Sequence, residues 1–199
     1  MKTVLTVSKI LTGIPLILSL AVGSASAQKF IIDQSHSQIG FAVKHMMIST
    51  VKGNFQKFEG HIFFDAKKIE KSSVEVSLLT ASIHTNNEKR DGHLRSGDFF
   101  EAEKNPQITF KSSKMEKKDK GYQAQGQLTM RGVSREVTIH FQLVGPIKND
   151  WGKQVLAVEG DLTINRQDYG VSWNKTLDSG GVLVSDSVKI DLNIEAAQE

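Results

Sequence analysis

The sequence predicts an all-β protein: an antiparallel up-and-down β-barrel of about eight or more strands with one or two short helices. Two observations lead to this fold class. Apolar and polar residues alternate along several segments, which is typical of strands with one buried face, and only one segment has a helical pattern. Because almost no helix is available to cover the apolar faces, they must pack against one another, in a closed barrel or in a two-sheet sandwich. We favour closure.

The clearest strand covers residues 122–130, where small and apolar residues occupy one face and Gln and Thr occupy the other. The face expected to be buried holds Tyr122, Ala124, Gly126, Leu128 and Met130. Residues 136–143 repeat the pattern after a short turn at 131–134. Since a short turn joins two alternating segments, we expect the two strands to form a β-hairpin.

Other strands are shorter or less regular. The same alternation appears at residues 39–43, 108–110 and 188–195. Less regular strands are expected at 55–65, 74–84 and 155–164. An eight-stranded barrel is about wide enough to fill itself with side chains or to hold one slender ligand. The sequence leaves both outcomes open.

One segment, residues 86–102, breaks the alternation and fits one or two short helices ahead of Phe99 and Phe100. Together with Leu94, these two aromatic residues could cap the barrel and gate its entrance. They could equally close an ordinary core.

The N-terminus predicts export. Lys2 and Lys9 precede an uncharged apolar stretch at residues 10–22, and small residues follow at 25–27. This is the pattern of a cleavable signal peptide. We therefore expect residues 1–27 to be removed and residues 28–199 to form one periplasmic domain, whose lack of cysteine leaves its stability to packing alone.

Composition argues against several function classes. The net charge of +3 includes Lys2 and Lys9, so the rest of the chain is nearly neutral and nucleic acid is not an expected partner. The six histidines form no HExxH pattern, and no G-x-S-x-G elbow or glycine-rich phosphate loop occurs. We expect no metal, no catalytic residues and no enzyme. An isomerase or dehydratase built on His45 and a nearby carboxylate stays as the enzyme alternative.

Ten short motifs, taken in order, closely resemble the YceI family from Phe30 to Glu195. They are residues 32–41, 43–45, 53–55, 64–65, 82–85, 90–94, 98–100, 105–110, 126–129 and 166–170. The resemblance implies a lipocalin-like antiparallel barrel that binds polyisoprenoid chains or other long amphiphiles, and many members of the family are exported. It implies no cofactor other than the bound lipid. Transient membrane contact and a homodimer formed through an exposed strand edge are further expectations.

The inward phase of the strands supplies the expected ligand-binding residues. They are Phe41, Val43, Phe110, Leu128, Met130, Ile139 and Phe141, with Leu94, Phe99 and Phe100 from the helical segment. Each of them could instead be ordinary core. Met130 would adapt to an irregular chain because its side chain is flexible.

Polar and aromatic residues near these strands give less decided predictions. His45 shares the inward phase of Phe41 and Val43, so it should contact either a protein partner or a ligand head group. Tyr169 and Trp173 could flank an apolar entrance or belong to the core. The family resemblance suggests a buried structural network that links the first strand to the helical segment; its members would be His36, Arg90, Asp91 and His93.

These observations together favour periplasmic binding and transport or storage of a long-chain isoprenoid lipid. Sequestration of other lipophiles, such as fatty acyl amides or hydrophobic antibiotics, is the alternative within the binding class. A barrel that is filled by its own side chains would have a purely structural role.

Overall fold

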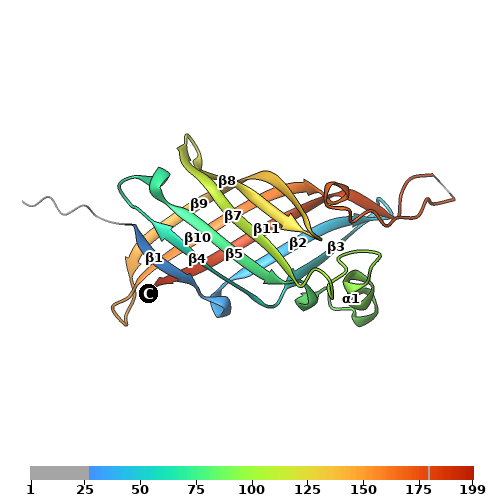
Figure 1. Cartoon of the computed structure of the whole chain (residues 1–199), viewed down its shortest axis with the longest axis horizontal. Helices are drawn as coiled ribbons and strands as arrows, with labels where there is room; N and C mark the ends of the chain where they lie inside the picture. The colour runs from blue at the N-terminus through green and yellow to red at the C-terminus, as the bar shows by residue number, and fades with distance from the viewer. Residues whose placement is uncertain (1–26, 179) are drawn as a thin grey trace, which may run out of the picture.

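The computed structural model describes residues 27–178 and 180–199, and the signal peptide predicted at residues 1–27 falls almost entirely outside them. The described chain is dominated by antiparallel strands (Figure 1). Their bounds are β1 Gln28–Ile32, β2 Gln38–His45, β3 Ser49–Phe55, β4 Phe58–Phe64, β5 Ser73–Leu79, β6 Ile83–His84, β7 Gln107–Lys118, β8 Gly121–Met130, β9 Val133–Lys148, β10 Gln154–Asn165 and β11 Val184–Gln198.

Eight of the strands close into a barrel. The order β1-β4-β5-β7-β8-β9-β10-β11 is completed by pairing of β1 with β11, where Phe30 lies opposite Gln198 and Ile32 opposite Ala196. The predicted antiparallel barrel is therefore confirmed, and the sandwich alternative is not the fold. β2, β3 and β6 extend the sheet beyond the closed ring.

The extension arises because three neighbouring stretches of the wall, β1–β2, β3–β4 and β5–β6, are each interrupted by a bend. The three bends lie side by side. β1 and β2 pair with different parts of the same β11 edge, and β3 and β4 follow them in the same way. The breaks are bonded to one another: the amide of Lys57 donates to Ser82 Oγ at 3.0 Å, and Gln34 Nε2 donates to the Gln56 carbonyl at 2.6 Å. Alternation read from sequence loses its phase at such a bend.

The β8–β9 hairpin was predicted and is present, with a tighter turn than expected. Arg131 and Gly132 both have positive φ, 50° and 73°, and Val133 already starts β9. Positive φ at both turn residues matches the right-handed twist of the flanking strands.

Gly126 in β8 lies so close to the Lys111 carbonyl of the neighbouring strand β7 that a Cβ at this position would collide with it.

Among the described residues there is one α-helix, α1 Glu88–Arg95, which lies at one end of the barrel (Figure 1). It begins after Asn87, whose side chain accepts a hydrogen bond from the Arg90 amide, as a helix N-cap does. Phe99 and Phe100 follow in a turn segment rather than in a second α-helix. Short 3-10 turns occupy Gln34–His36, Ile69–Lys71, Thr80–Ser82 and Arg166–Tyr169. No helix in the described ranges is long and apolar enough to span a membrane.

Candidate functional site: an apolar cavity inside the barrel

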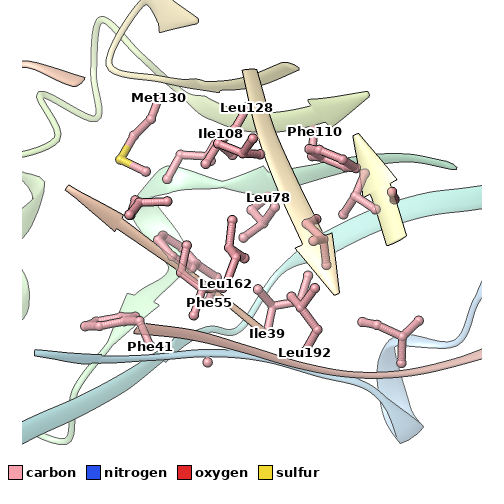
Figure 2. Close-up of a pocket in the computed structure, with 18 of the residues that line it drawn as sticks. Ile39, Phe41, Phe55, Leu78, Ile108, Phe110, Leu128, Met130, Leu162 and Leu192 are labelled. Carbon is pink, nitrogen blue, oxygen red and sulfur yellow. The ribbon is translucent and has the colours of Figure 1, made fainter. Parts of the chain in front are cut away.

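The interior of the barrel is not filled by its own side chains. It holds an apolar cavity of about 220 Å³. Figure 2 shows side chains from opposite walls, among them Phe41, Phe110 and Leu162, converging on this space. One water molecule needs roughly 10–15 Å³, so the cavity has room for an extended ligand.

The lining is almost entirely hydrocarbon. Every lining residue is apolar except Gly40, which has no side chain, and Arg166. Met115 and Met130 are the flexible members of the set. A ligand held here would gain from burial of its own apolar surface and would find hardly any hydrogen-bonding partner.

Most of the predicted ligand-binding residues come together around this cavity. Those that line it are Phe41, Val43, Leu94, Phe99, Phe100, Phe110, Leu128, Met130, Ile139 and Phe141. The strand residues among them lie on the inward face that was read from the alternation. Contact with a ligand stays a prediction.

Sequence reasoning missed a large share of the lining. β10 and β11 contribute Leu162, Ile164, Val188, Ile190 and Leu192, and β3 contributes Phe55. The β11 residues alternate clearly in sequence and could have been proposed on that signal. Phe55 could not, because the bend at Gln56 and Lys57 separates it from the alternation of β4.

An aromatic row closes the cavity wall near α1. The rings of Phe41 and Phe55 have centroids 6.1 Å apart, and Phe55 meets Phe100 edge-on at the same centroid separation. Phe99 is buried, while Leu94 and Phe100 are half-buried. These three residues therefore form part of the cavity wall at this end of the barrel.

Among the described residues that line the cavity, Arg166 alone carries a charge, and all of the N–H groups of its guanidinium are bonded to the protein. Nε donates to Ser185 O, Nη1 to the carbonyls of Val171 and Trp173, and Nη2 to Val184 O and the Asp186 carboxylate. A guanidinium has five N–H donors, so none is left for a ligand. Burial lowers the pKa of Arg166 from its usual value, and Asp186 opposes this effect.

Three predicted residues lie outside the lining. His45 is half-buried at the end of β2, beside the turn that leads to β3, so its inward phase does not carry its side chain to the cavity. Tyr169 is fully buried in the core, where burial raises the pKa of its phenol. Trp173 packs against His93 and Phe99, with ring centroids 5.0 and 5.3 Å away.

The predicted polar network is wrong as one buried unit. Buried Asp91 accepts hydrogen bonds from the amide and hydroxyl of Thr85, and Arg90 donates to the same hydroxyl and to the Thr85 carbonyl. This cluster anchors α1 to the end of β6. His93 instead pairs with Asp98 at 2.8 Å.

The fourth predicted member, His36, lies at the β1–β2 bend. It is exposed and pairs locally with Asp33 at 2.8 Å, so it makes no link to the helical segment. Hydrogen bonds from Ser35 and His36 lower the pKa of Asp33 to about 2, and the bond to Asp33 raises the pKa of His36.

Among the described residues, one group could be compared with a metal site. Potential ligand atoms of Asp33, His36 and Glu195 lie within 4.8 Å of one another. The Asp33 carboxylate already accepts three hydrogen bonds from Ser35 and His36, and His36 is exposed. The geometry fits a capped turn.

The fold and the cavity define the class of protein: a lipocalin-like antiparallel β-barrel with an apolar interior chamber. The chain belongs to the YceI family, because the YceI-like domain matches residues 30–196. A UPF0312 protein of Staphylococcus epidermidis is 38% identical over 168 residues, which cover 84% of this chain and 96% of the relative. A UPF0312 protein of Staphylococcus aureus is 35% identical over 167 residues, which cover 83% of this chain and 95% of the relative.

Solved structures agree with the fold. BcnA of Burkholderia cenocepacia is 25% identical with a TM-score of 0.72, covering 82% of this chain and 98% of BcnA. The YCEI protein of Campylobacter jejuni is 32% identical with a TM-score of 0.68, and the match covers 78% of this chain and 90% of the Campylobacter chain. A polyisoprenoid binding domain from Saccharophagus degradans has a TM-score of 0.63 at 14% identity, and the match covers 87% of this chain and 99% of that domain. At this identity the likeness concerns the fold alone.

Proposed function

We propose that this protein binds a long-chain isoprenoid lipid inside the barrel and carries or stores it in the periplasm. The observation that supports the proposal is the apolar lining of the cavity. Its only exceptions among the described lining residues are the Arg166 side chain, which is bonded to the protein, and the Gly40 backbone. A polar ligand would lose its hydrogen bonds to water there without replacement, which costs several kcal/mol for each buried group. An apolar chain makes no hydrogen bonds to water, so it loses none when it enters the cavity.

The energetics favour an exchange of lipid between apolar hosts. Burying hydrocarbon contributes about 0.8 kcal/mol per CH₂, so a chain of about 40 carbons would nominally gain about 30 kcal/mol relative to water. This exceeds the practical affinity ceiling of about 18–21 kcal/mol. The relevant reference is therefore a membrane or another apolar site, and transfer between the two lies near balance. A carrier requires such a balance because it must also release its load.

The comparisons support the chemical class. The Saccharophagus degradans domain with this fold is named for polyisoprenoid binding. Export rests on the N-terminal pattern at residues 1–27, and we extend the proposal to a periplasmic location on that basis. The bound lipid would be the only non-protein component. The lining offers no acid–base pair, which favours binding over catalysis.

Lipid uptake tests the proposal. The chain from Gln28 onward would be incubated with vesicles that contain polyprenols, separated from them, extracted and analysed for bound lipid. We expect close to one polyprenol per protein, recovered chemically unchanged. Protein that stays empty would contradict the proposal, and a chemically altered lipid would support the enzyme alternative. Parallel incubation with a fatty acyl amide tests whether the cavity prefers isoprenoids.

A further inference from the structure

The turn between β2 and β3 exposes three consecutive apolar side chains. Met46, Met47 and Ile48 are 40%, 65% and 82% exposed. They follow directly on His45, the last residue of β2. Exposed single apolar residues are common on protein surfaces, but a contiguous group marks a contact surface.

The backbone of this turn makes the apolar residues more unusual. Ile48 N donates to the His45 carbonyl at 3.2 Å, and the two residues between them, Met46 and Met47, have φ of 51° and 63°. Positive φ at both central positions favours Asn-Gly, and two methionines are strained there. The turn keeps side chains that its conformation disfavours, which points to a role for those side chains outside the fold.

The same turn lies at an end of the cavity. Val43, three positions before Met46, lines the cavity, and so does Val184, which pairs with His45. The amide of Met46 donates to the Leu183 carbonyl, so the turn is attached to the β10–β11 connection. In Figure 1 that connection projects from the end of the barrel where α1 lies.

Three lysines lie on the segments that flank the turn or are bonded to them. Lys44 and Lys52 are exposed on β2 and β3, and Lys175 lies where the β10–β11 connection meets Leu183. None of these three lysines forms an ion pair within residues 27–178 and 180–199. Of the nearby carboxylates, Asp186 is paired with Arg166, and Asp178 is exposed. Apolar side chains with lysines on the adjoining segments match the interface of an anionic bilayer.

We infer that the Met46–Ile48 turn docks on an anionic lipid bilayer and places the adjacent cavity end against it for lipid transfer. This rests on the proposed function, because the bilayer is the apolar host with which the cavity exchanges its ligand. Three side chains are too few for a stable protein interface, which needs roughly 800 Å² from each partner. They suit a contact that forms and breaks during transfer.

The opposite end of the barrel offers a natural control. Trp151 is 86% exposed in the β9–β10 turn, near the C-terminus in Figure 1. Its turn has no comparable conflict: Asn149 Oδ1 accepts from the amides of Trp151 and Lys153, and Gly152 adopts the positive φ. The cavity-lining residues nearest to it in sequence, Leu143 and Val158, are eight and seven positions away.

Vesicle flotation tests the inference. The chain from Gln28, which contains every strand of the barrel, would be mixed with vesicles of phosphatidylethanolamine and phosphatidylglycerol at 3:1, or with phosphatidylcholine alone. We expect binding to the anionic vesicles, at least fivefold weaker for the Met47→Ser/Ile48→Ser variant and unchanged for Trp151→Ser. Equal binding by the turn variant, or loss only in Trp151→Ser, would overturn the inference.

A second variant separates docking from folding. Met46→Asn/Met47→Gly supplies the residues that the turn conformation favours, so its melting temperature should rise while its vesicle binding falls. Transfer of geranylgeraniol from vesicles should slow at least fivefold, while uptake of geranylgeraniol added in ethanol without vesicles stays normal. If even the unmodified protein takes up none from ethanol, the proposed function fails, and flotation still decides whether the turn docks.

Discussion

Phe55 on β3 meets Phe100 edge-on, with an interplanar angle of 79° and ring centroids 6.1 Å apart. The contact joins the barrel wall to the segment that follows α1, and both rings line the cavity. The pair therefore contributes to the stability of this part of the cavity wall, and we expect it to affect access to the cavity as well.

Replacing Phe100 with Ala should weaken this closure. Phe100 is half-buried, so we expect a loss of about 2 kcal/mol, below the 3–5 kcal/mol typical of fully buried aromatic residues. Bound geranylgeraniol should also leave several times faster, as measured by transfer to acceptor vesicles. Phe100→Leu, which retains most of the volume, is the control. Destabilisation with an unchanged release rate would show that this contact does not limit access.

Filling the cavity should abolish binding without disturbing the outside of the barrel. Ile139 points into the cavity from β9, whereas its neighbour Thr138 lies in the outward phase of the same strand. Ile139→Trp should weaken polyprenol binding at least tenfold, which corresponds to about 1.4 kcal/mol. Thr138→Trp should bind normally. Equal affinity of the two variants, measured by fluorescence titration, would argue that the ligand does not occupy this chamber.

Removing the guanidinium of Arg166 should loosen the segment that it fastens to β11. Arg166→Met would leave four carbonyls without this donor and Asp186 without its partner, at a cost of about 3 kcal/mol. Urea denaturation measures the loss, and amide exchange at Val171 and Trp173 locates it. Asp186→Asn keeps the four carbonyl bonds and should cost less than half as much. Similar losses in both variants would mean that the ion pair dominates instead.

The pair formed by Asp33 and His36 should make the β1–β2 bend sensitive to pH. Asp33 has its pKa lowered from 3.8 to about 2, so its contribution is present above about pH 4 and is lost as pH falls through about 2. His36 has its pKa raised above 6.5, so its contribution is complete below that pH and is lost as pH rises through the raised value. The bend should be firmest between about pH 4 and 6.5.

Nuclear magnetic resonance titration checks this prediction. The His36 ring should titrate above its usual value in the intact protein and return toward 6.5 in Asp33→Asn. Amide exchange at Ser35 should quicken above the raised pKa, and His36→Gln should remove that dependence. A normal His36 pKa in the intact protein would contradict the pairing.

Much of the fold could be predicted from sequence because a strand with one buried face repeats every two residues. The alternation at β8 and β9 identified both the hairpin and the residues that face the cavity. It failed where the wall bends: the breaks at Gln34–His36 and Thr80–Ser82 shift the phase, so the short strands beside them could not be delimited. Sequence also could not show that the interior stays open, because that depends on the width of the closed ring.

The polar residues were harder to predict than the apolar ones. Arg166 begins the 166–170 motif of the family resemblance, yet its five donors converge on groups that the chain brings together only after folding. His36 and His93 each pair with a carboxylate only a few residues away in the chain. These local pairs take the place of the longer network that was predicted. Phase alone also misplaced His45, because a strand leaves the barrel wall where its turn begins.

Native mass spectrometry of the protein isolated from its own cells without detergent, followed by lipid extraction, tests the central claim most directly. The account predicts a stoichiometric mass addition that extraction identifies as a polyisoprenoid, and its loss in Ile139→Trp. Protein that carries no lipid, and that also stays empty after exposure to the membranes of those cells, would contradict the claim that this cavity is a lipid-binding site.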